Sequence, residues 1–272
     1  LHKAIRRQRQ MCIRDRKIMK DMNCVKVTVI GIIAAWAVSF MGVAKVQAQE
    51  FKVQGDLVSS YVWRGFYQTG VSFQPTLGFG IGGFSLTAWG STDFDGTSSS
   101  DGEAAKEIDL TAAYTFGDSG LTLSAASLWW AGQGSNKYFN FKSHETAHHF
   151  EAGLAYTLPL EKFPLSIAWY TMFAGADKNE KGKQNYSSYV ELNYPFSIKS
   201  VDLNATCGFL PYEAGVGVYG VPNSGFAVTN LALKATKDIK VTDKFAIPIF
   251  AQAIWNPCME DAHLVFGITL KP

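Results

Sequence analysis

Hydrophobic and polar residues alternate along most of the chain after residue 50. In residues 51–64 one face carries Val53, Gly55, Leu57, Ser59, Tyr61 and Trp63, and the positions between them run from Lys52 to Arg64. The same period recurs in residues 73–82 and, after a reversal at Gly82-Gly83, in residues 84–93. A period of two over about ten residues predicts β-strands with one apolar and one polar face.

Nine further segments show this period, which makes twelve predicted strands. They are 107–116, 121–129, 150–158, 165–173, 186–194, 201–209, 227–235, 245–255 and 264–270, with a turn expected at 238–243. Turns of roughly 2–6 residues alternate with loops of roughly 6–15 residues, as in outer-membrane barrels. The strands of a soluble sandwich would also alternate apolar and polar residues, but nothing in that fold requires short turns to alternate with long loops. We therefore predict an all-β, transmembrane, antiparallel up-and-down barrel of about twelve strands.

Aromatic residues lie at both ends of the predicted strands. One set is Tyr61, Trp63, Phe94, Trp129, Trp130, Trp169, Phe173, Phe209 and Trp255, and the other is Tyr114, Phe116, Tyr156, Tyr194 and Phe196. Cross-strand aromatic pairs in a soluble sheet would explain any one ring. Two belts together indicate the aromatic girdles of a membrane barrel.

The first 48 residues do not fit this pattern. Residues 27–44 are an apolar run that follows Lys20 and Lys26 and precedes Val46-Gln47-Ala48, so residues 19–48 are predicted to be a signal peptide cut after Ala48. The alternative is a single membrane-anchoring helix. Residues 1–18 include a segment, 11–16, that looks like a translated sequencing adapter, and we interpret them as an assembly artefact. The barrel is assigned to residues 49–272 and, through the signal peptide, to a bacterial outer membrane.

The charge balance changes once the first 48 residues are set aside. The whole chain has a net charge of +2, but residues 49–272 hold 15 Lys and Arg against 21 Asp and Glu, a net charge of about −6. The barrel therefore lacks the basic footprint of a nucleic-acid-binding protein, and we expect no nucleic-acid partner.

Three motifs suggest chemistry that their context does not support. His144-Glu145-Thr146-Ala147-His148 has the zinc-protease spacing, but in an extended chain its histidines are more than about 12 Å apart, and only a locally folded loop would bring them together. Residues 78–83 read G-x-G-x-x-G but precede a strand instead of a helix, so they predict a hairpin and no dinucleotide site. Tyr170, His149, Ser166 and Glu151 could meet in the lumen as catalytic residues. We expect no metal, no cofactor and no enzymatic activity.

Two cysteines, Cys207 and Cys258, lie in the barrel region. They could pair in an oxidising compartment, or remain thiols that serve packing.

The segments Ser60–Gly65, Gln74-Pro75, Trp89–Ser91 and Glu107–Leu110 resemble the TorF family of porins. These motifs span roughly the first 65 residues of the barrel region, and the remainder matches in pattern and size. The resemblance implies an outer-membrane barrel that passes small solutes. Many such barrels end on an aromatic residue that the barrel-assembly machinery reads. This chain instead has Phe266 in its last strand and ends Lys271-Pro272.

Arg64 is the residue that we expect to matter most. It is predicted to face inward near the outer end of the first strand, level with Asp93, Glu107 and Asp109. The four would create a transverse field at a constriction, or merely form a charge pair in the barrel wall. Inward acids at Asp56, Glu151, Glu191 and Asp202 outnumber Lys52 and Lys234, which predicts a mild cation preference.

The pattern thus predicts a porin-like channel for passive diffusion of small hydrophilic solutes. Its expected partners are outer-membrane lipids, the barrel-assembly machinery and the solutes themselves. The first alternative is a closed structural or adhesion barrel whose outer loops bind a partner, because twelve strands fall between packed and open interiors. The second alternative is an outer-membrane hydrolase.

Overall fold

A computed structural model describes residues 49–94, 106–131, 137–219, 225–243 and 245–272. The predicted signal peptide and the segment before it lie outside the described residues, as do the predicted loop at 95–103 and parts of the loops at 131–145 and 211–225. Among the described residues, no helix has the length and hydropathy needed to cross a bilayer.

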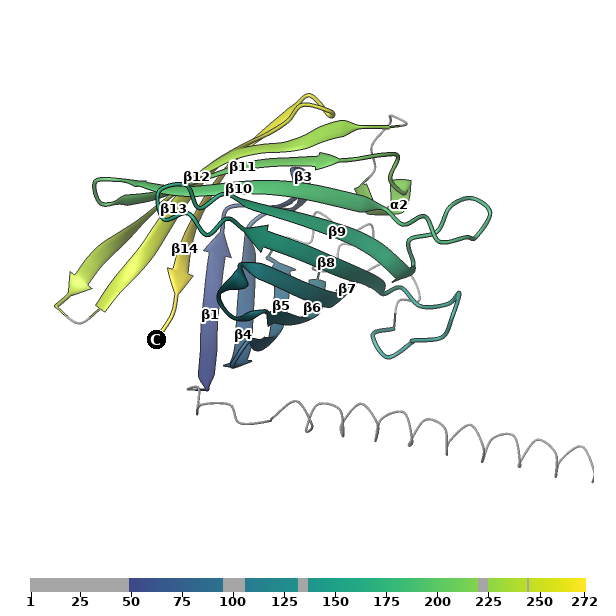
Figure 1. The fold of residues 1–272 in the computed structure, drawn as a ribbon, viewed down its shortest axis with the longest axis horizontal. Helices are drawn as coiled ribbons and strands as arrows, with labels where there is room; N and C mark the ends of the chain where they lie inside the picture. Colours follow the sequence, from purple (N-terminus) through teal and green to yellow (C-terminus); the bar gives the residue numbers. More distant parts are fainter. Residues whose placement is uncertain (1–48, 95–105, 132–136, 220–224, 244) are drawn as a thin grey trace, which may run out of the picture. The chain divides into compact units, whose positions relative to one another are not determined.

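The described residues form a closed barrel of twelve antiparallel strands (Figure 1). The strands are β1 (Glu50–Val58), β4 (Ser72–Ile81), β5 (Phe84–Asp93), β6 (Lys106–Thr115), β7 (Leu121–Trp130), β8 (His149–Thr157), β9 (Ser166–Gly175), β10 (Ser188–Ile198), β11 (Val201–Leu210), β12 (Ala227–Thr242), β13 (Phe245–Asn256) and β14 (Asp261–Leu270). Each strand pairs with the next, and β1 closes the ring by pairing with both β4 and β14. The predicted fold class is confirmed, and the sandwich is excluded.

The connections differ in length at the two ends of the barrel. At one end, here called the short-turn end, the strands are joined by tight links such as Gly82-Gly83 between β4 and β5 and Lys199-Ser200 between β10 and β11. At the other, the long-loop end, the links include residues 176–187 and the segment 211–226, which contains the short helix α2 (Val216–Tyr219). The sorting of loops predicted from the sequence is therefore present.

Two predicted strand boundaries are wrong. The first strand does not run to residue 64: β1 ends at Val58, and β2 (Tyr61–Trp63) and β3 (Phe66–Thr69) pair with each other as a separate two-stranded sheet. The turn expected at 238–243 starts too early, because β12 continues to Thr242 in register with β13. In both places the alternation of polar and apolar residues continues across the real boundary, so periodicity alone could not locate it.

The outer surface of the barrel is apolar and the inner surface is polar. Large side chains that project outward are exposed, among them Phe51, Val53, Leu77, Leu86, Ile108, Leu110, Leu123, Leu154, Ile167 and Leu233. Their strand neighbours point inward and are mostly polar and buried, for example Ser72, Gln74, Thr76, Ser91 and Asn230. Exposed rings occur near both ends, with Phe94, Phe173 and Trp255 at the long-loop end and Tyr114, Phe116 and Tyr156 at the short-turn end. This inverted distribution is that of a transmembrane barrel.

Candidate lumenal site

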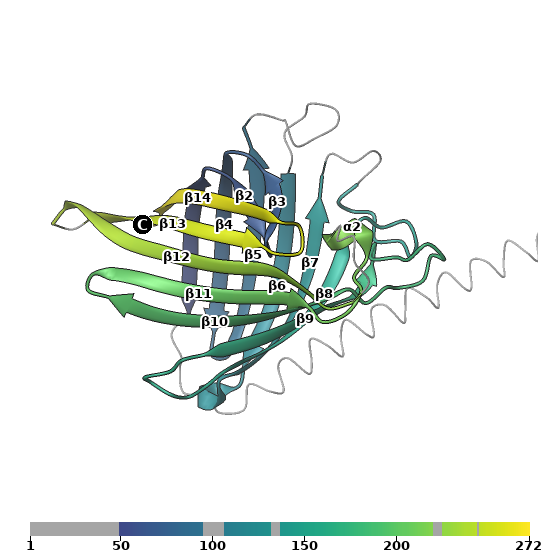
Figure 2. The same cartoon turned by 90° about the horizontal axis from the view of Figure 1, so that it is seen from above.

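The β2–β3 hairpin crosses the barrel interior from the long-loop end (Figure 2). It leaves the wall between β1 and β4, which lie opposite β9 and β10 in the ring of strands. Along its course the Tyr61 ring contacts Trp89 of β5 at 5.4 Å, and the Trp63 ring contacts Trp130 of β7 at 5.9 Å between centroids. The hairpin therefore narrows the lumen at this level.

The backbone at the tip of the hairpin is held by side chains of β12 and β13. Arg64 and Gly65 form the turn with positive φ angles of 53° and 88°. Asn256 donates its side-chain N–H to the Gly65 carbonyl at 3.1 Å, and the Thr229 hydroxyl donates to the Arg64 carbonyl at 3.2 Å. A Cβ on residue 65 would overlap the backbone carbonyl of Thr229, so both the conformation and the close approach require glycine here.

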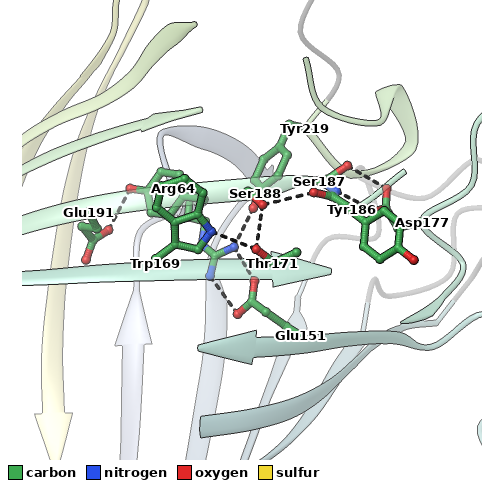
Figure 3. A network of polar contacts seen from close by, with 11 residues as sticks. Arg64, Glu151, Trp169, Thr171, Asp177, Tyr186, Ser187, Ser188, Glu191 and Tyr219 are labelled. Carbon is green, nitrogen blue, oxygen red and sulfur yellow. Dashed lines mark hydrogen bonds and ion pairs between the residues drawn. The ribbon is translucent and has the colours of Figure 1, made fainter. Parts of the chain in front are cut away.

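The Arg64 side chain ends in a clamp on the opposite wall (Figure 3). Its guanidinium donates to both carboxylate oxygens of Glu151 on β8, at 2.6 and 2.9 Å, and to the Tyr219 hydroxyl oxygen at 2.6 Å. The guanidinium carbon lies 4.6 Å from the ring centroids of Trp63 and Tyr170, and 4.7 Å from that of Tyr189. The side chains of Arg64 and Glu151 are only 9% and 8% exposed. A bidentate pair inside an aromatic cage, screened from water, is far stronger than a surface ion pair.

Helix α2 joins the clamp to the outer loops. The Tyr219 ring stacks on Trp63 with centroids 5.5 Å apart and planes 6° apart, and it packs with Tyr189, Leu210, Ala214 and Ala227 in a buried cluster. Burial raises the pKa of the Tyr219 phenol even though the Arg64 charge opposes the rise, so the phenol stays neutral at physiological pH.

A buried aspartate fastens the loop before α2. The Asp177 carboxylate accepts hydrogen bonds from the Ser187 N–H at 2.8 Å and the Ser187 hydroxyl at 2.7 Å. The same hydroxyl oxygen accepts the Gly215 N–H at 2.6 Å. The loops after β9 and β11 are therefore linked just before α2.

The acids predicted near Arg64 differ in how they contact it, although the Arg64 charge also acts on Asp109. Glu151 joins Arg64, whereas Glu107 and Asp109 lie on β6 beside the root of the hairpin, next to Tyr61. Arg64 itself is at the hairpin tip and not on a wall strand, which corrects its predicted position.

The remaining predicted acids are distributed along the lumen. Asp93 ends β5, and the Gln54 amide donates to Asp56 on β1 at 2.9 Å. Glu191 accepts from the Tyr189 hydroxyl at 2.7 Å and from Asn193 at 2.6 Å. Asp202 accepts from Ser197 at 2.7 Å near the short-turn end.

The segments with zinc-protease and dinucleotide-site spacing, His144–His148 and residues 78–83, do not form those sites. Both ring nitrogens of His148 are engaged, by the Ser127 hydroxyl at 2.8 Å and the Tyr138 carbonyl at 2.6 Å. Among the described residues no group of three or more His, Cys, Asp or Glu side chains is placed to hold a metal ion. Residues 78–83 form the end of β4 and a hairpin turn, as predicted.

The proposed catalytic set does not assemble. In the β8–β9 register His149 pairs with Gly175 and Thr157 pairs with Ser166. His149 and Ser166 are therefore at opposite ends of the strand pair, roughly 26 Å apart at about 3.3 Å per residue.

Cys207 carries a free thiol and is not joined to Cys258.

Sequence reasoning missed most of the cage around Arg64. Tyr189 and Tyr219 were not singled out, and Tyr170 was considered only as a catalytic residue. Tyr170 and Tyr189 are marked as inward by alternation, but nothing in the sequence indicates that the hairpin reaches them.

Comparisons with known proteins find similarity in structure. No protein-family model and no curated protein sequence matches the chain. A mutant porin of Rh. blastica is similar in structure with a TM-score of 0.35 and 12% sequence identity, over 86% of this chain and 79% of that one.

Proposed function

We propose that the protein is an outer-membrane channel through which small hydrophilic solutes diffuse passively, with a mild preference for cations. The observation that carries the proposal is the closed twelve-strand barrel with an apolar outer face and a polar inner face. Such a wall is stable only with lipid outside and water or polar groups inside. The TorF resemblance of residues 60–110 points the same way.

The charge of the lumen supports cation preference. The Arg64 charge is balanced by Glu151 in the clamp. Glu107, Asp109, Asp56 and Glu191 remain as inward acids, against Lys52 and Lys234. Rings of acidic side chains favour cations in channels.

A closed barrel is the second candidate, and one observation favours it. The hairpin, α2 and the tyrosines of the clamp fill part of the lumen at the long-loop end with buried aromatic rings. If these groups fill the whole cross-section of the lumen, no solute can pass through the barrel, and its outer loops would carry the function instead.

Single-channel recording distinguishes these candidates. The full chain is expressed in a Gram-negative host, purified from the outer-membrane fraction and inserted in a planar bilayer across a KCl gradient. We expect stable conductance steps with a reversal potential that indicates potassium over chloride. Folded and inserted protein that is electrically silent would support the closed barrel, and chloride preference would contradict the charge argument. Absence of the protein from the outer-membrane fraction would refute the assigned location.

A further inference from the structure

Two carboxylates on β6 are buried beside the hairpin and form no ion pair with a lysine or arginine of the described residues. Glu107 and Asp109 are two residues apart on the strand and both face the lumen, and Glu107 is only 4% exposed. Neither carboxylate oxygen of Glu107, nor Oδ1 of Asp109, has a hydrogen-bond partner of ordinary geometry among the described residues, although the Tyr61 hydroxyl and the Trp130 indole adjoin Glu107. An unpaired buried carboxylate is costly, so a cation at this position would be strongly stabilised.

Four aromatic rings lie on the strands and the hairpin beside the two carboxylates. Trp89 on β5 is the register partner of Asp109, and Trp130 on β7 is the register partner of Glu107. From the hairpin, Tyr61 packs on Trp89 and Trp63 packs on Trp130. We call this group, made of Glu107, Asp109, Tyr61, Trp63, Trp89 and Trp130, the acidic box.

The Arg64 clamp shows how this protein holds a cation with the same kinds of groups. There a guanidinium lies among the rings of Trp63, Tyr170 and Tyr189 and pairs with a carboxylate. Trp63 belongs to both sites. In the acidic box, no lysine or arginine of the described residues forms an ion pair with either acid. Segments 95–105 and 132–136, which precede β6 and follow β7, contain no lysine or arginine in their sequence.

The groups of the acidic box fit an organic cation better than a metal ion. Hard divalent ions require six or more oxygen ligands, whereas the box offers two carboxylates and several ring faces. Aromatic faces attract guanidinium and alkylammonium groups, because the ring quadrupole presents negative charge to them.

We propose that the acidic box binds an organic monocation, a guanidinium or alkylammonium head group, at the narrow level of the lumen. The proposal names a solute class for the channel and rests on the proposed function for the route by which the cation arrives. Binding itself does not depend on conduction, so the two can be tested separately.

Tryptophan fluorescence measures the binding, because three of the four rings are indoles. The full chain, purified folded in detergent, is titrated with tetramethylammonium or methylguanidinium chloride at constant ionic strength, with sodium chloride as the reference. We expect a saturable change with the organic cations and none with sodium. The double variant Glu107→Gln with Asp109→Asn should bind at least tenfold more weakly, and Asp202→Asn, an exposed acid near the short-turn end, should bind as wild type does.

A second variant separates the rings from the charges. Trp89→Leu keeps both carboxylates and should weaken binding several-fold, with folding of every variant checked by circular dichroism and heat-modifiable migration. The amide variants remove unpaired charges and conserve shape, so they are expected to fold. A folded wild type with no saturable response, an equal response to sodium, or an unchanged affinity in the double variant would overturn the proposal. A barrel that binds but does not conduct would refute only the channel.

Discussion

The Arg64 guanidinium has exchanged its hydration shell for a carboxylate, a phenol oxygen and three ring faces. Removing one member of such a buried pair leaves an unpaired charge away from water, which strongly destabilises the folded state. Replacing both members with uncharged residues is often tolerated. The value of the clamp therefore lies in fixing the hairpin against the far wall, and any change that leaves Glu151 alone should release it.

We expect Arg64→Ala to destabilise the docked hairpin by about 3 kcal/mol, the lower part of the range for broken buried pairs. Amide hydrogen exchange in residues 59–71 should then be about a hundredfold faster, since about 1.4 kcal/mol is tenfold in an equilibrium constant. The double variant Arg64→Met with Glu151→Gln should recover part of the protection. Lys240→Ala is the control, because its pair with Asp243 has side chains 69% and 96% exposed and such pairs contribute little. Equal exchange in Arg64→Ala and wild type would show that the clamp does not hold the hairpin.

The β2–β3 hairpin is the element that converts a plain barrel into one with a constriction. Its two strands are only three and four residues long and pair only with each other. An isolated hairpin of this size is not stable in water. It persists because its rings pack on β5 and β7 and its turn is bonded to β12 and β13.

Gly65→Ala tests the docking of this element. The new Cβ would overlap the Thr229 carbonyl in a backbone conformation that disfavours it, so we expect the turn to withdraw from β12 and the channel, if open, to conduct more. Gly182→Ala is the matched control: residue 182 also has a positive φ, 70°, but a Cβ there meets nothing within 4 Å. Single-channel conductance and exchange in residues 59–71 are the measurements. Similar behaviour of the two variants would show that strain at φ alone, and not the contact with Thr229, sets the effect.

At the scale of the whole molecule, the wall separates two solvents. Neighbouring residues on one strand face opposite environments: Leu86 is 47% exposed on the outer face, while Thr87 points inward and pairs with Thr111 and Gly78. Gly78 has no side chain, and the Lys52 side chain lies over it on the lumenal side.

Leu86→Arg and Thr87→Arg should therefore differ although they are adjacent. We expect Leu86→Arg to lower the free energy of unfolding in lipid vesicles by about 2–4 kcal/mol, because a cation on the lipid face of a barrel destabilises it. Thr87→Arg should change it much less and should reduce potassium preference. Reversible urea unfolding in vesicles gives the energies. A similar loss in both variants would argue against a hydrated lumen.

The twelve strands and their two faces could be predicted. Side chains alternate between the two faces of a strand, so a wall with lipid on one side and water on the other requires apolar and polar residues to alternate in every strand. The closure of the barrel was predicted from the same alternation together with the lengths of the connections. The Arg64 site could not be predicted. Alternation continued through residues 59–64, so the chain looked like one long strand, and the partner Glu151 is 87 residues away.

The sequence by itself determined the architecture and the inward set of acids, because side-chain alternation is a local property of each strand. Only the tertiary structure decided which inward residues meet. Closure places β8, β9 and β10 opposite β1 and β4. The close approach of Gly65 to Thr229 on β12 holds the hairpin tip where the Arg64 side chain reaches Glu151 on β8. Arg64 consequently pairs with Glu151, and among the described residues neither Glu107 nor Asp109, beside the aromatic rings, forms an ion pair with a lysine or arginine.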